Sequence, residues 1–326
     1  MAYSKSESSK QAVQDGIKFE NNISDEINHG HLNLNSNGGD IYKYICKLMN
    51  IDINSIQKIN AARSESNNSK ADVIIKVAYY NNTTQLIGLS CKNSTENALS
   101  LNRKSFSDIA NNLPSEFTEN HKEAILALNK WMGCTTEALE FIKTLSQSHL
   151  WIDTNRDDCL LLAELTKNER SNINLLFNDT LFFNTMCRHA LIGHNVEHKA
   201  DITLATHNKL STQFNDLLIF HNEEMINKLQ ETHKNHPNTF FKPIEDIQDP
   251  IFGIRTHNKT LNLKKSYQCN SISYGTKFLN IKNRADKPFG KLVVAADMKG
   301  FIPYATQIEN EKITLATTSN HSKKNI

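Results

Sequence analysis

Asp72, Ser90 and Lys92 place an acid, a hydroxyl and a cation at the ends of two short apolar segments. A carboxylate with backbone and hydroxyl oxygens beside it can hold Mg²⁺, which prefers oxygen ligands and keeps several waters. A neighbouring lysine can orient an attacking water and stabilise the charge that develops during phosphodiester hydrolysis. These residue types therefore suit metal-assisted hydrolysis, provided that the fold brings them together.

The two segments that carry these residues are typical of a β-hairpin. "ADVIIKVAYY" and "TTQLIGLSCK" are rich in β-branched and aromatic residues, and "NNTT" marks a turn between them. In an antiparallel hairpin the end of the second strand returns beside the start of the first, which places Lys92 next to Asp72. Alternation puts Ser90 and Lys92 on one face and turns Cys91 into the core. By spacing alone, an exposed Asp–Lys ion pair is the commoner outcome.

Composition is that of a soluble, somewhat polar globular protein. The chain has 326 residues, of which 38% are hydrophobic and 22% charged, enough for one compact unit with lobes. The formal net charge of +2 neither demands nor excludes a nucleic-acid partner, because a DNA groove needs clustered cations. No apolar run approaches the roughly 18 residues of a membrane span. We therefore expect no membrane association.

Cysteine usage and the absence of several motifs limit the cellular compartment and the kinds of reaction that the sequence supports. The six cysteines are scattered without a C-x-x-C pair, which favours reduced thiols in a cytoplasm. The N-terminus has no apolar signal core, so we expect no export. Neither G-x-x-x-x-G-K-[ST] nor G-x-G-x-x-G occurs, which leaves ATP-driven translocation and a dinucleotide cofactor unsupported.

Helical periodicity surrounds the predicted hairpin. Residues 8–28 place Val13, Ile17, Ile23 and Ile27 on one helical face, and "DIYKYICKLM" after the turn "NSNGG" predicts a second helix. A short third helix is expected over 53–60, followed by a polar loop over 62–70. From 103 to about 235 the pattern is mostly helical, clearest in "TENHKEAILALNKWM", "TTEALEFIKTLSQ" and "STQFNDLLIFHNEEMINKLQETHK".

Short apolar runs return after residue 240. "IFGIRTH", "TLNLKK", "GTKFLNIKN" and "GKLVVAADM" predict strands of a second sheet. The expected fold class is α+β, with a mixed β-sheet flanked by helices and a strand-rich C-terminal lobe. We expect three regions, lobes of one compact unit: catalytic over 1–112, mostly helical over 113–240, and strand-rich over 241–326 with a disordered tail.

The spacing of the hairpin residues resembles a known nuclease pattern. Asp72, a spacer of seventeen residues, and then Ser90-Cys91-Lys92 resemble the D…(D/E)xK site of the PD-(D/E)xK nuclease superfamily. The chain more closely resembles the MspI-like group of monomeric type II restriction endonucleases, including its GCGC-cutting relative. The similar stretches, within about 10–106 and 270–295, are "QAVQDGIKFENNISDEI", "LMNIDINSIQKINAARSESNNSKADVIIKV", "IGLSCKNS" and "SISYGTKFLNIKNRADKPFGKLVV".

The resemblance implies a role for each residue of the hairpin. Asp72 and the Cys91 backbone carbonyl would hold Mg²⁺, and Lys92 would position the water. Glu20, in the N-terminal helix, corresponds to a helix glutamate near the active site of that group. Ser90 replaces the superfamily's usual second carboxylate, where the MspI-like group carries Asn or Gln. A serine is shorter, so we expect it to be an outer ligand that reaches the metal through water.

Two polar segments are candidates for contacts with DNA. Amide and cationic side chains of the kinds that read base edges and bind phosphates occur just after the hairpin and near the C-terminus. The first group is Asn93, Ser94, Asn102, Arg103 and Lys104, and the second is Lys277, Asn280, Lys282, Asn283 and Arg284. The alternatives are a solvated helix start for the first group and an exposed strand protected by charges for the second.

The function expected from the resemblance is that of a cytoplasmic type II restriction endonuclease. Such an enzyme cuts double-stranded DNA at a short palindrome with Mg²⁺, here as a monomer, and a cognate DNA methyltransferase protects the host. Two alternatives stay open. One is a non-catalytic, sequence-specific DNA-binding protein on a nuclease fold, and the other is a structure-specific repair endonuclease.

Two further constellations are weaker candidates for metal sites. Cys187, His189, His194 and His198 suggest zinc, because His194 and His198 would share a helix face, but Gly193 interrupts that helix. Asp153, Asp157 and Asp158 lack the glycine and closing glutamate of an EF-hand. Core or solvated histidines and a polar helix start explain these residues better.

Overall fold

The described residues fall into two compact units. The computed structural model describes residues 7–93, 98–100, 109–110, 112–131, 137, 165–206, 208–236, 251–257, 260–266, 279–284 and 291–297. Unit 1 draws on 1–99 and 191–228, and unit 2 on 100–190 and 229–300. Each unit is thus assembled from separate stretches of chain. The three regions suggested by the sequence, in contrast, follow one another along the chain.

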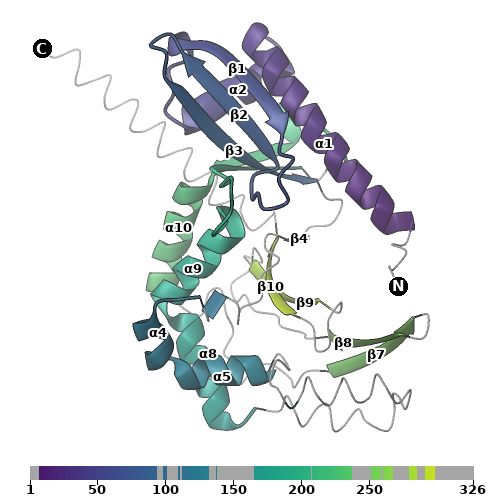
Figure 1. Ribbon diagram of the computed structural model, residues 1–326, viewed down its shortest axis with the longest axis vertical. Helices are drawn as coiled ribbons and strands as arrows, with labels where there is room; N and C mark the ends of the chain where they lie inside the picture. The colour runs from purple at the N-terminus through teal and green to yellow at the C-terminus, as the bar shows by residue number, and fades with distance from the viewer. Residues whose placement is uncertain are drawn as a thin grey trace, which may run out of the picture. The chain divides into compact units, whose positions relative to one another are not determined.

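Unit 1 is built on a five-stranded mixed sheet in the order β1-β2-β3-β5-β6 (Figure 1). Its strands are β1 (Ile56–Arg63), β2 (Val73–Tyr79), β3 (Thr84–Asn93), β5 (Ile202–Thr206) and β6 (Leu217–His221). β3 and β5 are parallel, and the other neighbours are antiparallel. The helices and this mixed sheet confirm the α+β class.

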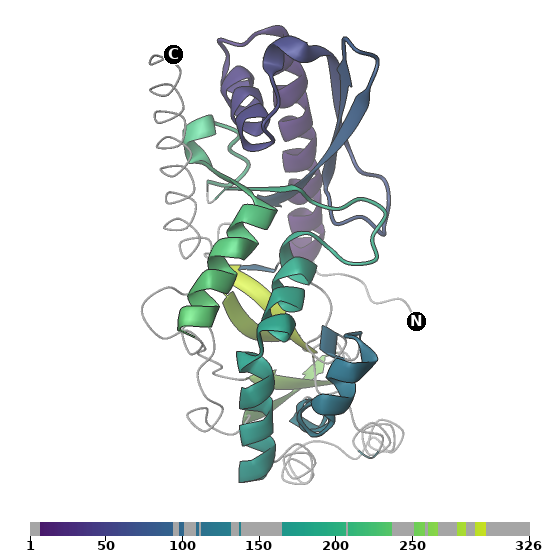
Figure 2. The ribbon, with the colours of Figure 1, turned by 90° about the vertical axis from the view of Figure 1, so that its left-hand side faces the viewer.

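Two helices cover one face of this sheet. These are α1 (Glu7–Leu32) and α2 (Asn37–Leu48), and Figure 2 shows both on the same side of β1, β2 and β3. Alternate strand residues turn toward them, as period 2 requires. The shared core contains Phe19, Ile23, Ile27, Ile41 and Ile45 from the helices and Ile59, Val73, Ile75, Val77, Ile87, Leu89, Cys91, Ile202 and Leu204 from the strands. Burial of these side chains holds the hairpin rigid.

Two glycines allow α1 and α2 to approach closely. A Cβ on Gly30 would collide with the backbone carbonyl of Gly38, and a Cβ on Gly38 would collide with that of Glu26. Ser36 begins α2, since its side chain accepts a hydrogen bond from the Gly39 N–H at 3.0 Å. The turn "NSNGG" therefore serves both the helix cap and the close contact between the helices.

The predicted hairpin is confirmed. β2 and β3 pair in the register Val73↔Leu89 to Ala78↔Thr84, so Asp72 lies opposite the end of β3. β5 then joins β3 with Ser90 beside Thr203 and Lys92 beside Ala205. β3 is consequently paired with β2 up to Leu89 and with β5 from Leu89 to Asn93, so β5 holds the residues that end β3.

Unit 2 contains helices and antiparallel strand pairs. Its helices are α4 (Ser115–Asn120), α5 (Lys122–Trp131) and α8 (Lys167–Asn178), while α9 (Thr180–Leu191) and α10 (Asn222–Asn235) run across the division between the units. Its strand pairs are β7 (Ile251–His257) with β8 (Thr260–Ser266), and β9 (Leu279–Arg284) with β10 (Lys291–Asp297). A short strand, β4 (Ala98–Ser100), lies at the division. The four strands expected after residue 240 are present, but they belong to two sheets, β7 with β8 and β9 with β10, rather than to one second sheet.

Two helical predictions were wrong. Residues 53–60 form a 3-10 turn, η1 (Ile53–Ser55), followed by the strand β1 rather than a short helix. In the segment 211–234, η2 (Phe214–Asp216) and β6 precede α10, because the apolar run Leu217–Phe220 pairs with β5. A short apolar run fits a buried strand and a helix equally well, so only the strand partner decides.

The buried face of α1 also differs from the prediction. Ile23 and Ile27 are fully buried, but Val13 is 49% exposed and the buried face begins at Phe19. The first turns of α1 extend past the sheet that buries the rest of the helix. Among the described residues no helix is both long and apolar enough to span a membrane. Apart from Glu137, the predicted helix over 135–147 lies outside the described residues, as does the predicted tail.

Candidate active site

Asp72 lies between the ends of two strands. Its backbone N–H donates to the Leu89 carbonyl at 2.7 Å, and its own carbonyl accepts from the Ser64 N–H at 2.8 Å. These two bonds continue the β1–β2 and β2–β3 ladders by one residue. The Asp72 backbone is therefore fixed on both sides, which leaves its side chain to point at the end of β3.

Lys92 and Cys91 converge on the Asp72 carboxylate. Lys92 Nζ lies 2.7 Å from Asp72 Oδ2, and the Cys91 N–H donates to the same oxygen at 2.8 Å. Lys92 Nζ also donates to the Cys91 carbonyl at 3.2 Å. The ammonium thus bridges a carboxylate oxygen and a backbone carbonyl oxygen. The expected proximity of Asp72 and Lys92 is confirmed.

The pair is neither a free surface ion pair nor fully buried. The Lys92 side chain is 19% exposed and that of Asp72 is 26% exposed, so solvent and a ligand can still reach both. Cys91 packs in the core as predicted, and burial raises the pKa of its thiol well above the ordinary value. The thiol therefore stays protonated, and the Cys91 carbonyl is the group that can serve as a ligand.

Ser90 lies behind the Asp72–Lys92 pair. It is 1% exposed, and its hydroxyl is 3.4 Å from Asp72 Oδ2. This distance is at the long end for a hydroxyl bond to a carboxylate, so the contact is weak. Ser90 adds a polar oxygen beside the Asp72 carboxylate but no second negative charge.

Glu20 of α1 supplies the other carboxylate of this region. Its Oε2 accepts a hydrogen bond from Arg63 Nε at 2.7 Å. Burial raises the pKa of the Glu20 carboxyl and the charge of Asp72 adds to the rise, while the hydrogen bond from Arg63 and the charges of Arg63 and Lys92 oppose it. The Glu20 carboxylate is therefore close enough to interact electrostatically with both charged residues of the hairpin.

Arg63 is the charged residue of this region that sequence reasoning missed. The segment 62–70 was interpreted as a polar loop, whereas Arg63 ends β1 and pairs with Val73, directly after Asp72. The register of β1 on β2 is what places it here. The run "IQKINAAR", which alternates in part, was the available signal for a strand.

The predicted DNA contacts are only partly described. Asn93 ends β3, and its Oδ1 accepts from the Leu210 N–H at 3.1 Å, which holds a backbone with a φ of 61° at Leu210. Asn280, Lys282, Asn283 and Arg284 belong to β9, which pairs with β10. Ser94, Asn102, Arg103, Lys104 and Lys277 lie outside the described residues. The assignment of these residues to DNA contacts stays a prediction.

The metal donors in unit 1 are few. Among the described residues no group of three or more His, Cys, Asp or Glu side chains is arranged to hold a metal ion. Asp72 and the Cys91 carbonyl fit a hard cation, because a cationic ammonium already contacts both oxygens. His194 and His198 share no helix face, because α9 ends at Leu191, in agreement with the interruption expected at Gly193.

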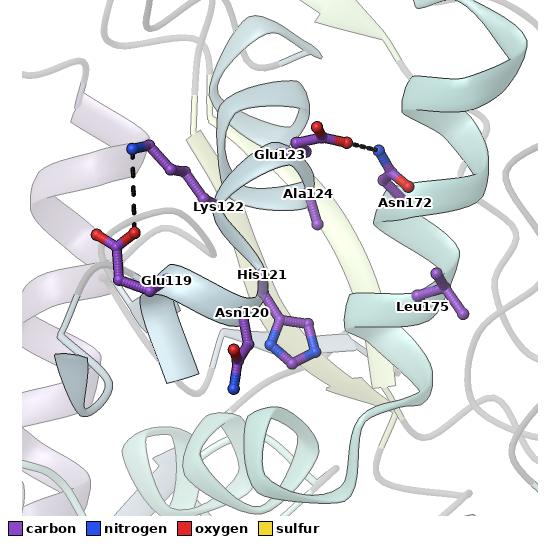
Figure 3. Close-up of a pocket in the computed structure, with 8 residues that line it drawn as sticks. All are labelled: Glu119, Asn120, His121, Lys122, Glu123, Ala124, Asn172 and Leu175. Carbon is purple, nitrogen blue, oxygen red and sulfur yellow. Dashed lines mark hydrogen bonds and ion pairs between the residues drawn. The ribbon is translucent and has the colours of Figure 1, made fainter. Parts of the chain in front are cut away.

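A separate pocket of about 330 Å³ lies in unit 2 (Figure 3). Most of its polar lining is already paired: Glu123 accepts from Asn172 at 3.1 Å, and Lys122 lies 4.0 Å from Glu119. The His121 ring stacks on that of Phe117, with 4.1 Å between the ring centroids. No described residue of this pocket belongs to the predicted site.

Comparison with known proteins does not identify the function, so the proposed function depends on the geometry of the site. No family model matches the chain, and no curated protein matches it. A crystal structure of restriction endonuclease MspI in complex with its cognate DNA is similar over 69% of this chain and 77% of that one. The sequence identity is 12% and the TM-score is 0.39. A likeness this weak carries no argument about function.

Proposed function

We propose that this protein is a Mg²⁺-dependent endonuclease of the type II restriction kind. It would hydrolyse phosphodiesters of double-stranded DNA at a short palindrome, as a monomer, with a cognate DNA methyltransferase protecting the host. The resemblance of "IGLSCKNS" and its flanking segments to the MspI-like group supports this assignment. The observation that carries it is the Lys92 ammonium, which contacts both Asp72 and the Cys91 carbonyl.

The residues of the site divide the work of hydrolysis. Asp72 and the Cys91 carbonyl would hold Mg²⁺, which neutralises charge on the phosphate oxygens. Lys92 carries three N–H donors, and within the described part of the chain it contacts Asp72 and Cys91, so it can also orient a water or a phosphate oxygen. Ser90 would act through a water, and Glu20 would add negative charge nearby.

A second candidate function follows from the small number of carboxylates at the proposed metal site. Ser90 stands where a second acid is usual, and the described residues contain no cluster of three acidic, His or Cys metal ligands. A protein of this kind could bind specific DNA without cutting it. It would then shift one duplex sequence in gels and leave it intact in every divalent cation.

Digestion of plasmid DNA with and without Mg²⁺, followed by sequencing of the ends, separates the candidates. Fixed ends at one short palindrome support the restriction function, and cleavage at junctions or mismatches indicates a repair nuclease instead. Specific binding without cleavage indicates the non-catalytic alternative. If Asp72→Ala and Lys92→Ala both cleave like the wild type, the proposed site is wrong.

Ser90 variants test whether this residue contacts the metal. We expect Ser90→Ala to lower the cleavage rate by less than about tenfold, because a residue that acts through water contributes less than a direct ligand. Ser90→Asp places a buried carboxylate beside Asp72, so it should lower the melting temperature in EDTA and regain stability in Mg²⁺. A loss for Ser90→Ala as large as that for Asp72→Asn would make Ser90 a direct ligand.

Glu20 gives the site a pH-dependent stability. Because the folded-state pKa of Glu20 is raised, its protonated form stabilises the fold, and this contribution is lost as the pH rises through the folded-state pKa. Glu20→Gln stays neutral at every pH and so lacks this loss of stability. In EDTA, the difference in melting temperature between the variant and the wild type should therefore increase in favour of the variant between about pH 4 and about pH 7. A difference that stays constant or shrinks over this range would contradict the raised pKa.

A further inference from the structure

We propose that Arg63 binds a backbone phosphate of the DNA beside Asp72. This inference rests on the proposed function and names a contact of the same site. Arg63 follows the buried residues Ile59 and Ala61, and its exposed side chain lies at the end of β1. A cation at this place is close to the phosphate that Asp72 and Lys92 would act on.

The register of the sheet places Arg63 next to the predicted catalytic residue. Arg63 pairs with Val73, and the following Ser64 N–H bonds the Asp72 carbonyl at 2.8 Å. Neighbouring strands lie about 5 Å apart, so the two backbones run side by side at this point. The Glu20 carboxylate, which bonds Arg63, is also influenced by the charges of Asp72 and Lys92. The four charged residues therefore form one cluster.

The base of the Arg63 guanidinium is held in one orientation. Arg63 Nε bonds Glu20 Oε2 at 2.7 Å. Asn28, on the same helix as Glu20, bonds both backbone groups of Ala61, each at 2.8 Å, and so holds the helix against β1. This amide pairs with the open edge of β1 as a neighbouring strand would. Helix α1 is thereby tied to β1 two residues before Arg63.

The far end of the Arg63 guanidinium is left open. Only Nε is used by Glu20, and within the described part of the chain the terminal Nη groups have no hydrogen-bond partner. The side chain is 39% exposed. An arginine that serves only to neutralise a carboxylate commonly pairs with it through two parallel N–H bonds. Because Glu20 uses Nε alone, the two terminal Nη groups of the planar guanidinium stay available to bind a phosphate.

The charges of the cluster favour the same assignment. The Lys92 ammonium already donates to Asp72 and to the Cys91 carbonyl, whereas the Arg63 Nη groups are available as further donors. Two carboxylates and two cations balance one another, so an arriving phosphate needs a cation that can contact it while keeping its own partner. Arg63 can do this, because Nε stays on Glu20 while the Nη groups bind the phosphate.

The experiment measures DNA binding rather than cleavage. The full chain is titrated into a fluorescent duplex oligonucleotide of mixed sequence in Ca²⁺, at salt concentrations from about 50 to about 200 mM. We expect Arg63→Ala to weaken binding and to reduce the slope of log affinity against log salt by about 1. Arg63→Lys should keep the slope, because the charge is retained, while binding more weakly than the wild type.

A matched control separates this contact from a general loss of charge. Lys58 is exposed on the same strand, at the other end of β1, so Lys58→Ala should leave affinity and slope unchanged. Thermal melting monitors folding, and Arg63→Gln, which keeps a polar chain, replaces Arg63→Ala if that variant unfolds. An unchanged slope in a folded, neutral Arg63 variant overturns the inference and leaves the proposed function standing. A wild type that binds no DNA overturns both.

Discussion

Replacing Lys92 by methionine is expected to abolish DNA cleavage and to strengthen the binding of a divalent cation. In the proposed mechanism the lysine orients the reacting groups, and removal of such a residue lowers rates by about 10²–10⁴-fold. Its ammonium also contacts the same two oxygens, from Asp72 and Cys91, that would hold Mg²⁺. Without this competing charge, Asp72 is left with an unpaired carboxylate that attracts a cation.

The two effects are measured on one protein preparation. Plasmid cleavage in Mg²⁺ reports activity, and calorimetric titration with Ca²⁺ reports affinity, which should rise on the order of tenfold as a partly buried charge loses its partner. Lys76→Met is the control, because Lys76 is exposed on β2 and contacts no described residue of the site. Unchanged or weaker Ca²⁺ binding in Lys92→Met would mean that the ammonium does not compete with the metal.

Replacing Asp72 by asparagine is expected to remove both cleavage and cation binding. Asn keeps an oxygen that can accept from the Cys91 N–H, now 2.8 Å from the carboxylate, so the hairpin should stay folded. It loses the single carboxylate that contacts Lys92, and with it the charge that attracts Mg²⁺. We expect the cleavage rate to fall by about 10³-fold or more.

The contrast between the two variants is more informative than either alone. Both should be inactive, but Ca²⁺ affinity should rise in Lys92→Met and fall in Asp72→Asn. A folding defect would lower affinity in both. Asp72→Glu is a useful companion, because it keeps the charge and moves it by one methylene. If Asp72→Asn binds Ca²⁺ as the wild type does, another ligand holds the cation and the proposed metal site is wrong.

A stability trade-off accompanies the proposed chemistry. Ionised Glu20 is held partly buried beside Asp72, and the raised pKa of its carboxyl shows that the fold would be more stable with this group neutral. Glu20 also orients Arg63 through the bond to Nε. Sites that use such charges commonly sacrifice some stability for function. Glu20→Gln should accordingly gain stability near neutral pH while losing part of its DNA binding.

The sequence by itself determined the hairpin and the pairing of Asp72 with Lys92. Both depend on interactions that are local along the chain: alternation of apolar residues, a short turn, and the return of one strand beside the other. The core position of Cys91 followed from the same alternation, whereas the burial of Ser90, which is 1% exposed, did not. The helices α1 and α2 were also predictable, because their apolar periodicity and the turn "NSNGG" are local signals.

Only the tertiary structure decided what surrounds the hairpin. The sequence predicts a helix and a loop where β1 lies, so Arg63, the last residue of β1, has no predicted role until the register of β1 on β2 places it opposite Val73, directly after Asp72. Likewise β5 and β6 join β3 from far along the chain, and the run Leu217–Phe220 became a strand only because β5 offered a partner. Pairings between distant segments depend on burial and backbone hydrogen bonding in three dimensions, which short-range periodicity does not encode.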